Sequence, residues 1–113
     1  MKKRYGKLVR DNVPDIIRAN GDMPTILTLD TDGYRKELLY KLIEESEEAR
    51  QAGFDDENRH EVLEQLADVA EVLDAILTEF DITREELQIA QASKREKRGG
   101  FKNKVFLESV KEK

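Results

Sequence analysis

The chain has 113 residues, enough for one domain (residues 1–113) with a modest core, and it is 40% charged and 38% hydrophobic. Its formal net charge of −5 argues against general binding of nucleic acid or of an anionic membrane, because both require a positive surface. The absence of cysteine excludes disulfides and thiolate metal sites.

The same composition gives two expectations about the protein's surroundings. So polar a chain is expected to take part of its core from a partner subunit. No apolar run approaches the ~20 residues of a membrane span, and the opening MKKRYGKLVRDN lacks the apolar segment of a signal peptide. We therefore expect a cytoplasmic protein with no membrane partner.

A short helix is expected near the start of the chain. Asp11 or Asn12 can cap it, Pro14 suits its first turn, and Asn-Gly at residues 20–21 ends it. The next segment, MPTILTLD at residues 23–30, predicts an extended stretch or at most a lone strand.

Two long helices are expected to follow. Thr31 or Asp32 would cap the first, which runs to about Ala52 with Gly53 as its stop signal. The second spans roughly residues 58–79.

A third helix is expected to begin near Thr83, where TREE has the form of a capping box, and to run to about Lys97. The tail after RGG is compatible with a short strand or with a helical turn. The pattern predicts an all-α helical bundle with two long antiparallel helices carrying acidic motifs, plus short terminal segments.

Helical geometry assigns faces to the first long helix. One apolar face is predicted to hold Leu38, Leu39, Leu42, Ile43, Ser46 and Ala49. Glu45 lies at the margin of this face, with Lys41 and Glu48 in the same row, whereas Glu44 and Glu47 point further toward water.

The second long helix is more apolar and is expected to be central. Its predicted apolar arc consists of Val62, Leu66, Val69, Ala70, Leu73, Ile76 and Leu77, extended by Val72 and Ala75. One narrow row on it holds Glu64, Asp68 and Glu71, with Glu61 beside them. Asp74 falls on an apolar flank, where a carboxylate would need a partner.

Two antiparallel helices of this kind can bring four or more carboxylates together. A hard divalent cation would make the arrangement favourable, and Mg²⁺ suits carboxylates and waters best. The alternative is a pair of solvated acidic faces, with Lys41, Arg50 and Arg59 supplying salt bridges. A di-iron bundle would need Glu-x-x-His pairs, which the one histidine, His60, does not supply.

A basic cluster surrounds a Gly-Gly pair in KREKRGGFKNK, and its cations are Lys94, Arg95, Lys97, Arg98, Lys102 and Lys104. Backbone amides at the glycines can approach an anion closely. The alternative is a helix C-terminus whose cations satisfy the helix dipole. Lys7 and Arg10 form a smaller basic patch. If either patch folds back near the acids, metal and cations together are what a polyphosphate needs.

Four segments carry a resemblance to a known family: KLVRDNVPDIIRANG, LLYKLIEESEEA, VLEQLADVAEVLDAI and KREKRGGFKNKVFLE. In this order and spacing they resemble the phosphoribosyl-ATP pyrophosphohydrolase-like branch of the MazG-type all-α nucleotide pyrophosphatases. The resemblance runs from about Lys7 to Glu108, and its most specific pieces are KLVRD-x-(I/V)-P and K-x-x-K-R-G-G-F.

The resemblance implies a Mg²⁺ site, with Mn²⁺ as an alternative, held by EExxE on one helix and an E-E-x-x-D type motif on the next. The implied metal ligands are Glu45, Glu48, Glu64, Gln65 and Asp68. Gln65 stands where the pattern often has a second glutamate, so its amide oxygen would coordinate without charge, or Glu64 would take over. Glu71 and Asp74 match residues that serve an outer metal shell or the nucleotide.

The activity implied is house-cleaning hydrolysis of a nucleoside triphosphate, or a related nucleotide, between its α and β phosphates. Glu44 and Glu45 are the implied catalytic residues, Glu44 orienting water or accepting its proton. The implied phosphate-binding residues are Arg10, Lys94, Lys97 and Arg98. The family is generally oligomeric, which implies a homo-oligomer, a dimer or a tetramer. The alternatives are phosphoribosyl-ATP as substrate, or a non-catalytic helical module that binds a nucleotide or a protein, which Gln65 favours.

Overall fold

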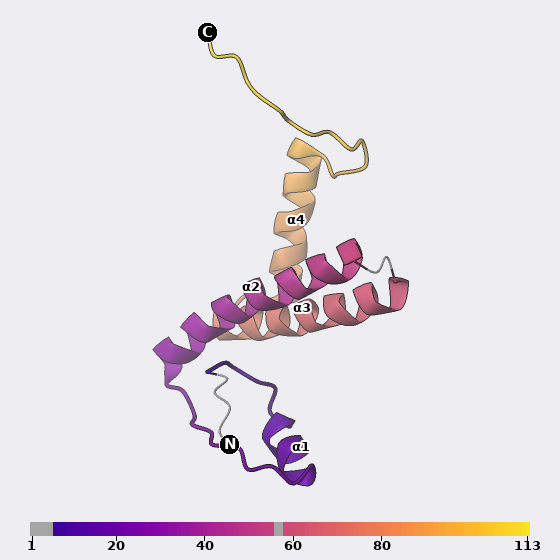
Figure 1. Cartoon of the computed structure of the whole chain (residues 1–113). Coiled ribbons are helices and arrows are strands. Elements are labelled where there is room, and N and C mark those ends of the chain that lie inside the picture. Colours follow the sequence, from indigo (N-terminus) through magenta and orange to yellow (C-terminus); the bar gives the residue numbers. More distant parts are fainter. Residues whose placement is uncertain (1–5, 56–57) are drawn as a thin grey trace. The chain divides into compact units, whose positions relative to one another are not determined.

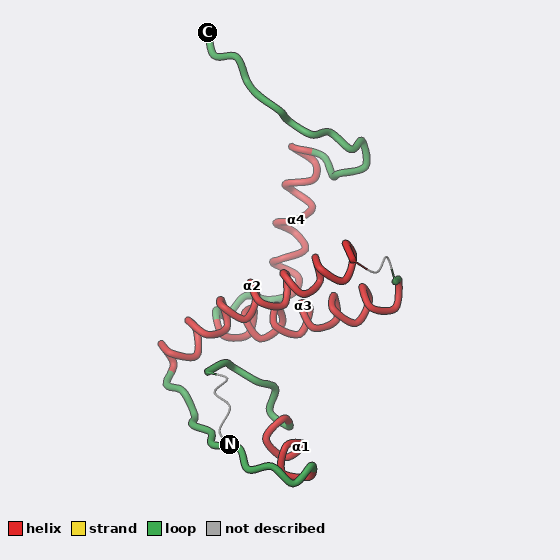
Figure 2. The backbone as a smooth tube through the Cα atoms, viewed as in Figure 1, coloured by secondary structure: helices red, strands yellow, loops and turns green. Residues whose placement is uncertain are grey.

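In residues 6–55 and 58–113, which the computed structural model describes, all regular secondary structure is helical (Figure 2). The helices are α1 (Val13–Ala19), α2 (Thr31–Asp55), α3 (Arg59–Glu79) and α4 (Arg84–Arg98), labelled in Figure 1. The all-α prediction is confirmed. The chain divides into two units, one ending at Asp81 and the other beginning at Ile82, and each is described by itself. None of the described helices combines the length and the apolar character that crossing a membrane requires.

The short helix α1 has the ends that the sequence predicts. Asn12 is its N-cap residue and Pro14 lies in its first turn, where the missing proline N–H would have no partner anyway. The N–H of Asn20 donates to the carbonyl of Ile16 at the other end, and Gly21 follows with φ 91°, a conformation that glycine adopts at little cost. Residues 23–30 form no strand.

The bounds of α2 differ from the prediction at both ends. The N–H of Gly33 donates to Asp30 Oδ1 over 2.8 Å, so Asp30 caps the helix and Thr31 is already inside it. Gly53 does not stop the helix, which continues to Asp55. A glycine stop needs the left-handed conformation, and the described glycines with positive φ do not include Gly53.

Helix α3 begins where predicted, because Asn58 accepts hydrogen bonds from the N–H groups of His60 and Glu61. It lies beside α2 along most of its length (Figure 1). Arg35 of α2 ties it to the end of α3, with its Nε 3.1 Å from Glu79 Oε1 and its guanidinium 5.1 Å from the centre of the Phe80 ring.

The core between α2 and α3 is small. Among the described hydrophobic residues only Leu38, Val72 and Leu77 are buried. The predicted apolar face of α2 is rotated relative to the observed one, since Leu39 and Ile43 of that face are exposed. The apolar residues of α2 extend further round the helix than the contact with α3, so periodicity alone does not locate the buried strip.

The same correction applies to α3. Leu66 and Ala70, expected in the apolar arc, are exposed, while Val72 is buried. Asp74, expected on an apolar flank, is also exposed. The buried residues of α3, Val72 and Leu77, both lie within the predicted arc, so the arc was right in part.

The second unit contains α4 and the tail. Thr83 and Glu86 form the predicted capping box, in which each side chain accepts from the other residue's backbone N–H. The helix ends at Arg98, one residue beyond the expected Lys97, and Gly99 follows with φ 80°. A turn occupies residues 102–103, and residues 104–113 form neither strand nor helix.

Candidate metal centre

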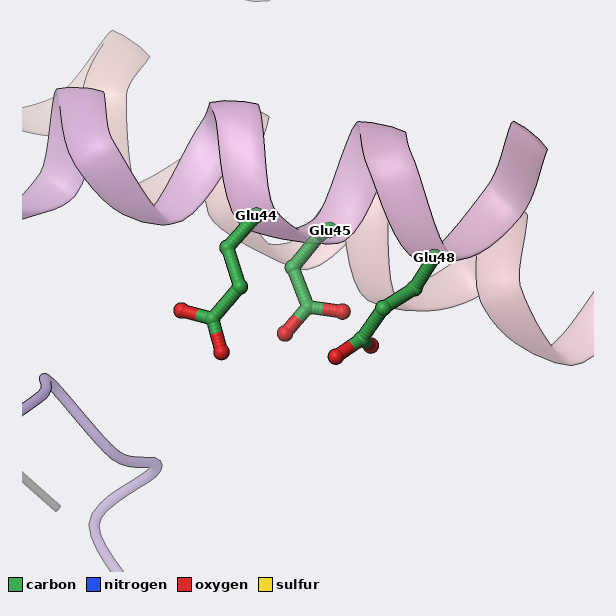
Figure 3. A group of neighbouring side chains, drawn as sticks. All are labelled: Glu44, Glu45 and Glu48. Atoms are coloured by element: carbon green, nitrogen blue, oxygen red, sulfur yellow. The ribbon is translucent and has the colours of Figure 1, made fainter. Parts of the chain in front are cut away.

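Three glutamates of α2 direct their carboxylates to the same side of the helix (Figure 3). Glu45 and Glu48 follow Glu44 by one and four residues, and one carboxylate oxygen of each of the three lies within 4.8 Å of those of the other two. Such a group is strongly self-repelling unless cations accompany it. The structure thus brings together all three glutamates of the EExxE motif.

Lys41 supplies one of these cations from the preceding turn of the same helix. Its Nζ lies 3.3 Å from Glu44 Oε2 and 3.5 Å from Glu45 Oε1, and its side chain is only 15% exposed. Arg50, to which the alternative of solvated acidic faces assigned a salt bridge, pairs with Glu47 at 2.6 Å. These ion pairs explain how α2 tolerates consecutive acids that would each cost a few tenths of a kcal/mol, about 0.2–0.5 per like-charged pair.

Glu45 is the buried member of the group. The whole residue is 8% exposed, and its Oε2 accepts no hydrogen bond from any described residue. Burial raises the pKa of this carboxyl, the nearby carboxylates of Glu48 and Asp68 raise it further, and Lys41 opposes them. The sequence placed Glu45 at the margin of the apolar face, and the structure buries it more deeply than that.

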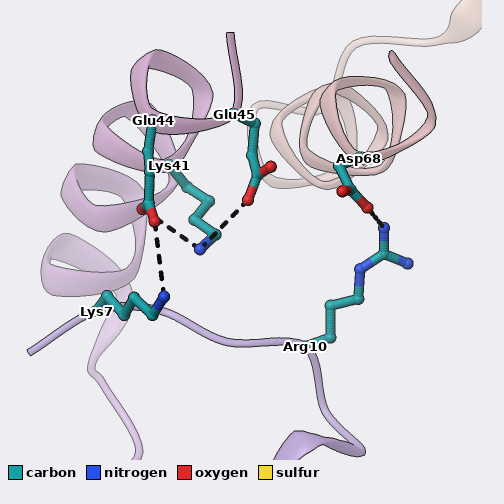
Figure 4. Close-up of polar contacts among 6 residues, drawn as sticks. All are labelled: Lys7, Arg10, Lys41, Glu44, Glu45 and Asp68. Carbon is teal, nitrogen blue, oxygen red and sulfur yellow. Dashed lines mark hydrogen bonds and ion pairs between the residues drawn. The ribbon is translucent and has the colours of Figure 1, made fainter. Parts of the chain in front are cut away.

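Asp68 of α3 faces the same space. In Figure 4 the side chains of Glu45 and Asp68, from neighbouring helices, point to the same side of the helix pair. The segment before α1 crosses this side and carries two cations into contact with the acids: Arg10 Nη2 lies 2.7 Å from Asp68 Oδ1, and Lys7 Nζ lies 3.8 Å from Glu44 Oε1 (Figure 4). The smaller basic patch therefore does fold back near the acids.

The remaining predicted ligands of α3 have contrasting environments. Oε1 of Gln65 is buried and receives no hydrogen bond within the described part of the chain. The Glu64 side chain is 60% exposed, and its Oε1 lies 3.6 Å from His60 Nε2. An unsatisfied oxygen thus belongs to the glutamine and not to the neighbouring glutamate. Their roles as ligands stay predictions, as do those of the exposed Glu71 and Asp74.

The larger basic cluster lies in the second unit. Lys97 and Arg98 belong to the last turn of α4, where cations stabilise the helix dipole, as the alternative interpretation predicts. Lys94 is exposed on the same helix. The chain after α4 curls around a hollow of about 390 Å³ lined by residues 98–105. The proposed contact of Lys94, Lys97 and Arg98 with phosphates stays a prediction.

Two cations at the acids were not among the predicted site residues. Lys41 precedes Glu45 by four residues, the spacing at which opposite charges pair on a helix, so the sequence did contain its signal. The signal for Lys7 was weaker. It consisted only of its position beside Arg10 in a short basic segment.

A stretch of 46 residues in this chain is similar to part of another protein. No family model matches this chain, and no solved structure matches it. It is similar to an uncharacterized protein of Mycolicibacterium smegmatis (strain ATCC 700084 / mc(2)155), with 50% identity over 46 residues. The similar region covers 41% of this chain and 47% of that protein.

Proposed function

We propose that the chain is a cytoplasmic, MazG-like nucleotide pyrophosphohydrolase that requires Mg²⁺ and cleaves a nucleoside triphosphate, or a related nucleotide, between its α and β phosphates. The proposal rests above all on one observation. Glu45 and Asp68, from two neighbouring helices, point to the same side of the helix pair, and cations of the same chain already lie against these acids and Glu44.

The oxygen atoms at this site suit a hard divalent cation as ligands. The carboxylates of Glu44, Glu45 and Glu48 cluster, and the buried oxygens Glu45 Oε2 and Gln65 Oε1 lack a hydrogen-bond donor in the described residues. Oxygen ligands of this kind fit Mg²⁺, or Mn²⁺ as an alternative. Glu45, Glu48 and Asp68, with Gln65 or Glu64, would hold the ion. When bound, it would neutralise and polarise phosphate oxygens.

The chain's own residues take the remaining roles in the proposed reaction. Glu44 is about one-third exposed and accepts ion pairs from Lys7 and Lys41, so its carboxylate is accessible to water and held in place. It would orient the attacking water or accept its proton. Arg10 would bind phosphate oxygens. The phosphate-binding roles implied for Lys94, Lys97 and Arg98, which belong to the second unit, stay predictions.

We also propose that α2 and α3 are antiparallel within one chain, and that two copies of the chain pair through the outer faces of these helices. The support is the small core, together with apolar residues that stay about half exposed or more: Leu39, Ile43, Leu63 and Leu66. A hollow of about 450 Å³ lies on α3 and the end of α2, lined partly by Val62, Leu63 and Leu66. Pairing two such helix pairs would give a four-helix core with apolar side chains in its seam.

The decisive experiment measures pyrophosphate release from a panel of nucleoside triphosphates and phosphoribosyl-ATP, with Mg²⁺ and with EDTA. We expect release that disappears in EDTA and falls at least about a hundredfold in Glu45→Gln and in Asp68→Asn, since each substitution removes a negative ligand. The panel also identifies the substrate, because the proposed chemistry is the same for each member.

Two control variants match the test variants in chemistry and position. Glu47→Gln removes a carboxylate from the same helix, and Asp15→Asn removes one that pairs with an arginine at 2.7 Å, as Asp68 does. Both should keep wild-type turnover. If no nucleotide is cleaved while Glu45→Gln only stabilises the fold, the non-catalytic module that Gln65 favours is the better interpretation.

Gln65 has a test of its own. Gln65→Glu adds a charge at a buried oxygen that has no donor among the described residues. We expect more activity at low Mg²⁺, because a charged ligand binds the ion more tightly. No change would place Gln65 outside the ligand set.

A further inference from the structure

The segment before α1 contributes two cations to the acid site, and they reach two different helices. Lys7 contacts Glu44 of α2 at 3.8 Å, and Arg10 contacts Asp68 of α3 at 2.7 Å (Figure 4). We refer to residues 7–10 as the basic strap. A strap that pairs with both helices covers the side to which their acids point.

The ion pairs of the strap are exchangeable. The side chains of Lys7 and Arg10 are 43% and 58% exposed, compared with 15% for Lys41. Exposed ion pairs of this kind contribute about 0–1 kcal/mol each. The strap can therefore leave the acids at small cost, whereas Lys41 stays in the site.

The cations offset most, but not all, of the negative charge at the site. Glu44, Glu45, Glu48 and Asp68 place four carboxylates at the site, and Lys7, Arg10 and Lys41 place three cations beside them. A divalent cation would compete with Lys7 and Arg10 of the strap for the same carboxylate oxygens. The effect of the strap on metal affinity can therefore be measured.

We infer that Lys7 and Arg10 exchange partners during ligand binding: they neutralise Glu44 and Asp68 in the metal-free protein, and they bind the oxygens of a polyphosphate once a divalent cation occupies those acids. This inference rests on the proposed function and deepens it, since it adds Lys7 to the site and gives Arg10 two alternating partners. A guanidinium binds phosphate in a bidentate manner as readily as it binds a carboxylate.

The exchange predicts effects of opposite sign from one substitution. Arg10→Gln removes a competitor of the metal, so Mn²⁺ alone should bind about two- to fivefold more tightly. The same variant lacks a phosphate partner, so inorganic tripolyphosphate should bind about tenfold more weakly in saturating Mg²⁺. Lys7→Gln should show both effects with smaller size. Isothermal titration calorimetry of the full chain measures each affinity without any turnover of nucleotide.

Arg18→Gln is the matched control, because Arg18 is 52% exposed and pairs with Asp15 at the same 2.7 Å. It should change neither affinity. If Arg10→Gln weakens Mn²⁺ binding, or leaves either affinity unchanged, the exchange is wrong although the metal site stands. If the wild-type chain binds no Mn²⁺ at all, the proposed function fails and the inference fails with it.

Discussion

Lys41 Nζ lies 3.5 Å from Glu45 Oε1, and both side chains are nearly buried, 15% and 11% exposed. The same ammonium group lies 3.3 Å from Glu44. One internal cation therefore faces two carboxylates, and the group with Glu48 keeps a net negative charge. Residual negative charge in a partly buried place attracts further cations, which accounts for the strap and supports the proposed metal.

Removing Lys41 should increase the repulsion between the carboxylates of Glu44 and Glu45. We expect Lys41→Met to lower the free energy of unfolding by about 1–3 kcal/mol in EDTA, because the buried carboxylate of Glu45 then lacks its counter-charge. Millimolar Mg²⁺ should restore part of the loss. Urea titrations measure both effects. Lys36→Met, at an exposed lysine of the same helix, is the control, and equal stability of the two variants would contradict this view of Lys41.

Glu45 should make the metal-free protein less stable as the pH rises. Its pKa is raised mainly by burial, so the folded protein holds this proton more tightly than the unfolded chain does. The contribution of the neutral acid is complete below the unfolded pKa and is lost as the pH rises through the folded pKa.

Glu45→Gln should therefore melt at a higher temperature than the wild type at pH 7 in EDTA, because the neutral amide avoids the cost of a buried charge. The difference should vanish near pH 4, where both side chains are neutral. Differential scanning fluorimetry across this range measures it. A gain that is independent of pH would mean that the ionisation of Glu45 is not its cause.

The start of α2 allows a direct comparison of the expected cap with the observed one. Asp30→Ala removes the acceptor of the Gly33 N–H and should cost about 1 kcal/mol. Thr31→Ala should stay within about 0.5 kcal/mol of the wild type, because Thr31 is exposed inside the helix. Thermal denaturation measured by circular dichroism distinguishes the two, and the reverse order would restore the expected cap.

The proposed pairing of two copies has a matched pair of variants. Ile43 of α2 and Ile89 of α4 are exposed to similar extents, 67% and 63%. A glutamate at position 43 would bury a charge in the seam, so Ile43→Glu should sediment as a monomer at concentrations where the wild type is a dimer. Ile89→Glu should leave the dimer intact. A wild type that sediments as a monomer at every concentration would refute the pairing.

Local chemistry explains which elements the sequence could predict. The caps at Asn58 and Thr83 depend on side chains within three residues of the groups that they bind, so a short stretch contains all the relevant information. The predicted stop at Gly53 was wrong for a related reason. Glycine permits the left-handed conformation without requiring it, and α2 continues through it.

Tertiary contacts explain the rest. The buried strips of α2 and α3 depend on where the two helices meet. The apolar arc of each helix is wider than the surface that its partner covers, so the sequence does not distinguish which part of the arc becomes buried. The row through Asp68 did predict its side of α3. The contact of Asp68 with Arg10 spans 58 residues. The sequence therefore predicted the role of the basic patch only on the condition that the patch folds back near the acids.

The order of the elements along the chain also has a kinetic consequence. Helices α2 and α3 are consecutive, so the contacts nearest their connection close a short segment and are expected to form early in folding. The contact of Arg10 with Asp68 closes a segment of 58 residues and is expected to form later. Part of the acids would then assemble before Lys7 and Arg10 arrive. During that interval dissolved cations would neutralise these carboxylates, and refolding in Mg²⁺ should be faster than in EDTA.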